Sequence, residues 1–172
     1  MQRRGMRLDQ FRLGHSYERV MPGPTYIDSI KELPRVYAGV DDASADSVEK
    51  FLRTVINTKE CELTRLPSTN ATEMCKVLEN SYRAVNISFM VEWSRYAEEA
   101  GVNMYDMVKA IRGRATHANL MFPGLGVGGY CLTKDPLLAS WSRRNFFGGH
   151  TGLQTSEKGV SINDQMPRFA FE

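Results

Sequence analysis

The 172-residue sequence lacks the long apolar runs and the charge excess that would assign it to several large classes of protein. No apolar stretch approaches the roughly 18 residues that a membrane helix requires, so we expect no membrane partner. The basic start, Met1 to Gly5, is not followed by an apolar segment, which argues against a secretory signal. A formal net charge of +2 gives no electrostatic argument for a nucleic-acid partner.

Cysteine and histidine are scarce and form no recognisable framework. Cys61, Cys75 and Cys131 are an odd number without disulfide spacing, which suits the reducing cytoplasm, where we expect the protein. Together with three histidines they make no metal-ligand pattern, so no metal is expected.

Nucleotide-binding fingerprints are also missing. No G-x-G-x-x-G motif follows a strand near the N-terminus, and the glycines from Gly124 to Gly129 have neither that spacing nor the Gly-Lys-Ser/Thr of a Walker loop. The apolar content of 42% is nevertheless enough for a hydrophobic core in one medium domain or parts of two.

The first part of the chain has an α/β pattern. Arg35–Val40 predicts a short buried strand, and polar residues from Asp41 to Ser47 can cap a helix. Apolar residues from Val48 to Ile56 follow at helical spacing and predict a helix of about four turns. The alternating segment Cys61–Leu66 predicts a second strand. A strand, a helix and a strand form a parallel crossover, which has too few strands for a stable sheet alone.

The second part has a helical pattern. Asn70 with Glu73 predicts a capping box, and Ala71–Ala100 contains no Gly or Pro and predicts one long helix that ends at Gly101. A shorter helix is expected from Asn103 to Gly113.

Two further helices complete the predicted fold. One is expected to begin with Asp135 as its cap and Pro136 at its first position, and the last to run from Ser156 towards Asp164. The predicted class is therefore mixed α/β and mostly α. A partial Rossmann-type segment over residues 1–69 precedes an all-helical central domain over residues 70–172.

The glycine-rich loop Pro123–Gly129 is followed, after one residue, by Cys131. A thiol beside a helix N-terminus is a candidate nucleophile, but a free cysteine can equally be a buried apolar residue or part of a tight turn. Asp135 can cap a helix and also hold a water molecule. Arg114 and His117 precede the loop and are either ordinary surface residues or a grip for phosphate.

Three residues elsewhere could assist such a nucleophile. Lys76 and Asn80 are four residues apart on the long helix and so share a face, where they could donate to an oxyanion or simply be a solvated lysine and a buried asparagine. Glu18 could act as an acid, a base or a water-positioning group, or could be a surface carboxylate paired with Arg19.

Four segments in order resemble one family. His15–Gly23 is similar to SPERVxPG, with Tyr17 in place of Pro, and Glu73–Ile87 is similar to the start of the family's central helix. Pro123–Pro136 is similar to PGxGVGGHCxxxDP, and Ser161–Pro167 is similar to an IND-MP segment. The chain thus resembles the nucleotide-sugar 6-dehydrogenases, meaning UDP-glucose dehydrogenase and its UDP-N-acetylmannosamine relatives.

The resemblance implies oxidation of a UDP-sugar 6-alcohol to the uronic acid, with NAD as cofactor and a cysteine thioester as intermediate. It implies that Cys131 is the nucleophile and that Lys76 and Asn80 stabilise the oxyanion. Asp135 and Glu18 would orient or activate water.

The resemblance also implies how ligands and partners are bound. Lys134 would approach NAD, and the long helix would form a homodimer. The implied substrate-binding residues are Phe122, Gly124 and Gly128, with either Arg114 or His117 reaching substrate across the dimer.

The sequence departs from the family at several positions. Tyr130 replaces a usual His or Ser, Pro22 favours the N-acetylmannosamine branch, and Lys134 resembles the UDP-glucose branch. The family's dinucleotide fingerprint and its third domain are not in this sequence, so we expect little dehydrogenase activity from these residues alone. The alternative is a non-catalytic helical dimerisation module.

Overall fold

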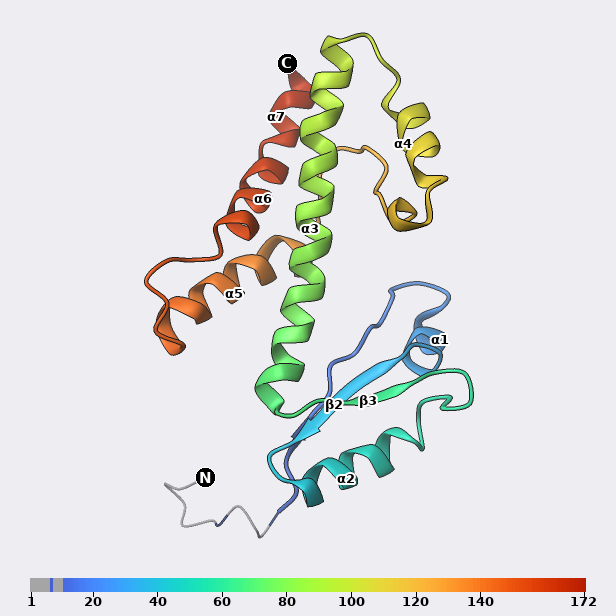
Figure 1. The fold of residues 1–172 in the computed structure, drawn as a ribbon, viewed down its shortest axis with the longest axis vertical. Coiled ribbons are helices and arrows are strands. Elements are labelled where there is room, and N and C mark those ends of the chain that lie inside the picture. The colour runs from blue at the N-terminus through green and yellow to red at the C-terminus, as the bar shows by residue number, and fades with distance from the viewer. Residues whose placement is uncertain (1–6, 8–10) are drawn as a thin grey trace. The chain divides into compact units, whose positions relative to one another are not determined.

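The computed structural model describes residue 7 and residues 11–172. The chain forms two compact units, unit 1 ending at Lys76 and unit 2 running from Val77 to Glu172. The division lies within the long helix α3 (Thr69–Glu99), so its first turns belong to unit 1 and the remainder to unit 2. Figure 1 shows the elements of both units.

Unit 1 contains a three-stranded mixed sheet in the order β1-β2-β3. The central strand β2 (Arg35–Gly39) pairs antiparallel with β1 (Gly14–His15) and parallel with β3 (Leu63–Arg65), with Val36 opposite Thr64. The parallel pair confirms the crossover predicted from the sequence. The strand β1 was not predicted, because two residues are too few to show an alternating pattern.

The crossover helix α2 (Asp42–Leu52) begins where the sequence indicates. The side chain of Asp41 caps it by accepting a backbone N–H three residues further on at 2.6 Å. The helix is one turn shorter than predicted, and Ile56 lies beyond its end. A physical reason is the hydroxyl of Thr54, which donates to the carbonyl of Phe51 at 2.7 Å and competes with the helical pattern.

The core of unit 1 lies between the sheet and α2. It is formed by buried side chains from β2, α2 and the segment that leads into β3: Tyr37, Ala45, Leu52, Ile56 and Cys61. A short helix, α1 (Tyr26–Lys31), lies outside this core and was not predicted, since six residues give too little periodicity.

The start of α3 differs from the predicted capping box. The helix already begins at Thr69, so Asn70 lies inside it and the Asn70–Glu73 capping box is wrong. The hydroxyl of Ser68 accepts the backbone N–H of Ala71 at 3.2 Å and so supplies the cap.

The end of α3 and the start of the next helix follow the sequence closely. Gly101 adopts φ +66°, and the N–H of Val102 donates to the carbonyl of Ala97 at 2.8 Å, as in a Schellman C-cap. Asn103 then caps α4 (Met104–Arg112) through the N–H of Tyr105 at 3.0 Å. These ends confirm that Gly and Asn mark helix boundaries here.

The helix after the glycine loop begins earlier than predicted. Helix α5 (Cys131–Phe146) starts at Cys131, so Asp135 is not its cap and Pro136 lies inside it. The carboxylate of Asp135 is hydrogen-bonded to side chains and unavailable for capping. As the sixth residue of the helix, the proline removes one helical hydrogen bond, that to the carbonyl of Leu132.

The remaining helices pack along α3. Figure 1 shows α6 (Gln154–Asp164) and α7 (Met166–Phe171) beside the C-terminal part of α3, which belongs to the same unit. On another side, the loop after α4 contains a short 3-10 helix over residues 115–117. The core of unit 2 joins α3 to α4 through buried apolar side chains: Met90, Ala97, Met104 and Val108. Among the described residues, no helix is long and apolar enough to cross a bilayer.

Candidate functional site

In unit 1 the structure brings Lys76 and Glu18 together. The Nζ atom of Lys76 donates to the backbone carbonyl oxygen of Glu18 at 3.0 Å and lies 3.6 Å from its Oε1. The other carboxylate oxygen accepts the N–H of Val20. A lysine from the start of α3 therefore donates a hydrogen bond to the main chain of the predicted acid and forms an ion pair with its side chain.

A buried arginine is hydrogen-bonded to the segment that carries Glu18. Arg35 on β2 donates to the carbonyl of Tyr17 at 2.8 Å and to that of Ile30 at 2.9 Å. Burial lowers the pKa of Arg35, and the nearby charge of Glu18 opposes that shift. Sequence reasoning missed Arg35, although a charged residue at the start of an apolar strand was a usable signal.

In unit 2 the carboxylate of Asp135 is a hydrogen-bonding centre. It is buried and accepts the Nδ2 of Asn80 at 2.6 Å on Oδ2 and the ammonium of Lys134 on Oδ1. The hydrogen bond to Asp135 raises the pKa of Lys134. Both oxygens of a buried carboxylate are thus satisfied, as its burial requires.

Cys131 is the first residue of α5 and is exposed, which excludes the buried-residue alternative. It lies four residues before Asp135 and so on the same face of the helix. Backbone N–H groups at a helix N-terminus favour negative charge that develops nearby. The ammonium of Lys134 interacts with Cys131 electrostatically and lies 5.0 Å from the ring centroid of Tyr130. The thiol is therefore accessible and beside a cation.

The predicted sugar-binding loop is open at two glycines. A Cβ added to Gly124 or Gly128 would meet no atom within 4 Å. At the start of the loop Phe122 stacks on Tyr105, with ring centroids 6.0 Å apart, and lies under the guanidinium of Arg112 at 4.9 Å. The residue that precedes the loop is thus packed against another ring, while the backbone at Gly124 and Gly128 has open space beside it.

The two alternatives for a phosphate grip are both at the surface. Arg114 precedes the 3-10 helix and His117 ends it, and both are exposed. The Nδ1 of His117 is 2.8 Å from the hydroxyl of Thr116. The geometry within this loop does not choose between the two residues.

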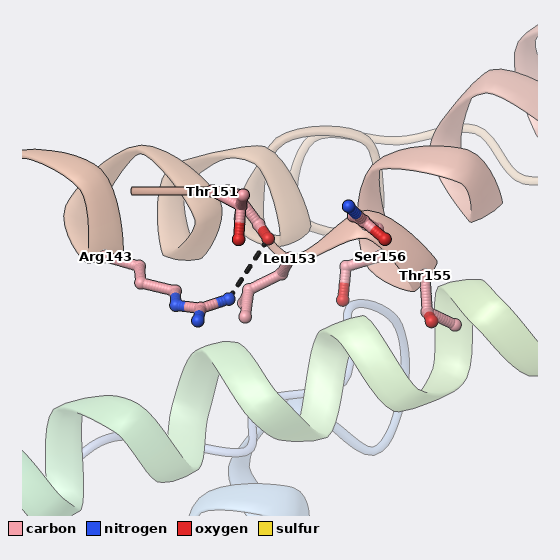
Figure 2. A pocket seen from close by; sticks show the side chains of 7 residues that line it. Arg143, Thr151, Leu153, Thr155 and Ser156 are labelled. Carbon is pink, nitrogen blue, oxygen red and sulfur yellow. Dashed lines mark hydrogen bonds between the residues drawn. The ribbon is translucent and has the colours of Figure 1, made fainter. Parts of the chain in front are cut away.

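Two pockets in unit 2 lie apart from these residues. One, of about 350 Å³, is lined by Arg143 and residues 151–156. Arg143 donates to the carbonyl of Gly152 at 3.2 Å, and Figure 2 marks a hydrogen bond of Arg143 with a dashed line. The other, of about 400 Å³, lies between α3 and α6 and includes Phe89 and Lys158. None of the predicted site residues lines either pocket. No group of three or more possible metal ligands was found within the described part of the chain.

Comparison with known proteins gives consistent matches. The family model for the central domain of the UDP-glucose/GDP-mannose dehydrogenase family matches residues 70–165. The chain is 31% identical over 160 residues to UDP-N-acetyl-D-mannosamine dehydrogenase of Methanocaldococcus jannaschii, covering 93% of the chain and 34% of that protein. It is 35% identical over 164 residues to the enzyme of that name from Pyrococcus horikoshii, covering 93% and 35%.

A solved structure agrees with these matches. That of a UDP-D-ManNAc dehydrogenase from Pyrococcus horikoshii aligns with a TM-score of 0.76 at 32% identity, covering 91% of this chain and 35% of that one. The chain therefore spans about a third of the length of the curated relatives that it matches.

Proposed function

The chain belongs to the UDP-glucose/GDP-mannose dehydrogenase family, and on this basis we propose that it forms part of an NAD-dependent nucleotide-sugar 6-dehydrogenase. The observation that carries the proposal is the exposed thiol of Cys131 at the start of α5, with the buried carboxylate of Asp135 one turn along the same face. The names of the relatives favour UDP-N-acetyl-D-mannosamine as the sugar, in agreement with Pro22.

The proposed reaction needs a nucleophile that can form and release an acyl group. Loss of a hydride and a proton converts the 6-alcohol to an aldehyde, and the sulfur of Cys131 adds to its carbonyl carbon. Loss of a second hydride and proton from this hemithioacetal gives a thioester. Water then attacks the thioester, which releases the carboxylate and returns the thiol. Two molecules of NAD per turnover, one for each oxidation, would supply the hydride acceptors.

The side chains keep donors free for this chemistry. The amide of Asn80 has two N–H groups, of which the hydrogen bond to Asp135 uses one. The ammonium of Lys76 has three, and Glu18 accepts through its carbonyl and carboxylate. We assign Lys76 and Asn80 to oxyanion stabilisation, with Asp135 and Glu18 acting on water.

Lys134 is the residue of this chain that fits an approaching anionic cofactor. Its ammonium is partly exposed, beside Cys131, and its charge is secured by Asp135. The sequence contains no G-x-G-x-x-G motif to bind the pyrophosphate of NAD, so we assign no other cofactor contact to this chain.

The reactivity of the three cysteines tests the proposed nucleophile. We expect iodoacetamide at neutral pH to alkylate Cys131 faster in the native protein than in the same protein unfolded in urea, as measured by mass spectrometry of each thiol. Cys61 and Cys75 serve as internal references. The comparison with unfolded protein separates activation of the thiol from mere exposure.

A substitution of the neighbouring cation sharpens this test. Lys134→Met should slow native alkylation of Cys131, whereas Lys158→Met on α6 should not. Native alkylation of Cys131 no faster than in urea would contradict the proposal and favour the non-catalytic dimerisation module.

We also propose a homodimer through α3. The helix exposes large apolar side chains at intervals of three, four and seven residues, which is the spacing of one helical stripe: Leu78, Tyr82, Phe89, Trp93 and Tyr96. The rings of Phe89, Trp93 and Tyr96 contact one another in sequence, with centroids 6.0 and 5.9 Å apart. An exposed apolar stripe of this kind is typical of an interaction surface.

Sedimentation velocity tests the dimer directly. The wild-type chain should sediment as a dimer, and Trp93→Glu should shift it to monomer, because two-fold symmetry places each introduced charge in the interface. Glu92→Gln, one position away on α3, is the matched control and should leave the dimer intact. A wild-type monomer at micromolar concentration would exclude this interface.

A further inference from the structure

Asn163 lies in the segment Ser161–Pro167, which has no role in the proposed chemistry. It is near the end of α6, and its side chain is only 3% exposed. Its Nδ2 donates to the backbone carbonyl of Ala84, in the middle of α3, at 3.0 Å. This buried bond joins two helices that are 79 residues apart in sequence.

The backbone of the same residue touches the glycine loop. Gly126 adopts φ +86°, a conformation that other residues rarely adopt. A Cβ at this position would lie 3.0 Å from the carbonyl oxygen of Asn163 and 3.0 Å from the Cβ of Met166. Asn163 therefore contacts α3 through its side chain and the loop through its main chain.

The loop is connected in turn to the nucleophile. The hydroxyl of Thr133 in the first turn of α5 donates to the carbonyl of Gly129 at 2.9 Å. Gly129 is the last glycine of the loop and lies two residues before Cys131. This hydrogen bond joins the end of the loop to the first turn of α5, which contains Cys131.

The side chain of Asn163 is not fully satisfied. Its Oδ1 is buried and has no hydrogen-bond partner among the described residues. A buried polar atom left unpaired is destabilising, and an apolar side chain of similar shape would avoid that cost. A role other than stability explains an asparagine here better than packing does.

We propose that Asn163 is a positioning residue, which fixes the glycine loop 123–129 to α3 and thereby sets the presentation of Cys131. Its significance for catalysis rests on the function proposed above. The placement of the loop does not.

The test is Asn163→Leu, which removes the donor and the unpaired oxygen at nearly constant volume. The backbone amide resonances of Gly126, Gly128 and Gly129 report the loop, with Gly101 and Gly113 as references at the ends of α3 and α4. The native alkylation rate of Cys131 is measured beside them. The matched control is Asn145→Leu, because the Nδ2 of Asn145 donates to a helical carbonyl at 2.7 Å but is exposed.

We expect Asn163→Leu to move the loop glycine resonances but not the reference ones. Native alkylation of Cys131 should change at least about threefold towards the rate in urea, since small displacements of a reacting group have large kinetic effects. Asn145→Leu should do neither. Unchanged loop resonances in a folded Asn163→Leu protein would overturn the proposal.

Two further outcomes are separable. If Asn163→Leu does not fold, Gly126→Ala perturbs the same contact from the loop, and unchanged Gly128 and Gly129 resonances in that variant would also overturn the proposal. If the loop resonances move while wild-type Cys131 reacts no faster than in urea, the positioning role stands and the proposed enzymatic function fails.

Discussion

The two units hold a lysine against a carboxylate group in different ways. In unit 1, Lys76 donates to the main chain at Glu18, and the acid itself is exposed. In unit 2, Lys134 binds Asp135 directly, and that carboxylate is 5% exposed. At this pair unit 1 therefore adds a main-chain hydrogen bond to a long ion pair, whereas unit 2 uses hydrogen bonds between side chains. Substitutions should therefore damage the two units by different routes.

The largest effect is expected from Gly39→Ala in unit 1. A Cβ at Gly39 would lie 2.2 Å from the nitrogen of Ala45 and 2.6 Å from the carbonyl oxygen of Asp41, both backbone atoms that cannot move without shifting α2. Overpacking against backbone should cost about 3 kcal/mol or more. The measurement is the urea dependence of alkylation of Cys61, which is buried in the core of unit 1.

Two features of the chain provide the controls for this substitution. Both tryptophans, Trp93 and Trp141, belong to unit 2, so fluorescence reports that unit separately. Gly128→Ala introduces the same methyl group into open space and should leave both readouts unchanged. An unchanged urea midpoint for Cys61 in Gly39→Ala would show that α2 can move away from β2.

A smaller effect, restricted to alkaline pH, is expected at Tyr37. Burial, together with a hydrogen bond to Glu49, raises the pKa of Tyr37 from 10.0 to about 12. Because the folded state favours the neutral phenol, its contribution is complete below pH 10 and is lost as the pH rises towards 12. A two-unit shift corresponds to roughly 3 kcal/mol when it is lost in full, of which about 2 kcal/mol is lost by pH 12. Tyr37→Phe should remove this part of the pH dependence.

The free energy of unfolding of unit 1, followed at Cys61 between pH 9 and 12, checks this expectation. Tyr26→Phe replaces a half-exposed tyrosine of the same unit and is the control, because it should retain the alkaline loss. Absorbance at 295 nm should show one phenol that titrates late in wild type and is missing from Tyr37→Phe. Identical pH profiles for the two variants would refute the assignment.

Local signals were sufficient for much of the fold. The strands around Tyr37 and Thr64, and the helices α3 and α4, follow from periodicity, Gly101 and the cap Asn103, all of which act within a few residues. The start of α5 was predicted at Pro136 instead of Cys131, because Asp135 and Pro136 have the pattern of a helix cap and first residue. Their true environment depends on Asn80, which is 55 residues away.

The candidate site shows the same limit. Sequence patterns selected Lys76 and Glu18 separately, but only the structure shows that the lysine binds the main chain of the acid. The position of Arg35 at the start of an apolar strand was a usable signal, but its partners could not be predicted, because backbone carbonyl groups have no sequence signature. The IND-MP segment contains Asn163, but the sequence suggested no role for it, because its contacts with Ala84 and Gly126 join segments that are distant in sequence.

The smallest of these effects, in unit 2, is expected at acid pH. Glu157 on α6 accepts hydrogen bonds from the hydroxyl of Ser140 and from Arg144, both on α5, and these two bonds hold its pKa below the usual 4.5. The ionised form is therefore favoured in the folded state. Its contribution is present above pH 4.5 and is lost as the pH falls through the lowered value.

Glu157→Gln should flatten this acid dependence in unit 2 and lower the urea midpoint at neutral pH. Tryptophan fluorescence between pH 6 and 3 measures both effects. The control is Glu92→Gln, an exposed carboxyl on α3 in the same unit. In unit 1 the alkylation of Cys61 should retain its wild-type profile, since Asp41 and Glu49 govern acid sensitivity there. A parallel change at Cys61 would show that the units do not unfold independently, and the contrast between backbone support and side-chain support would then fail.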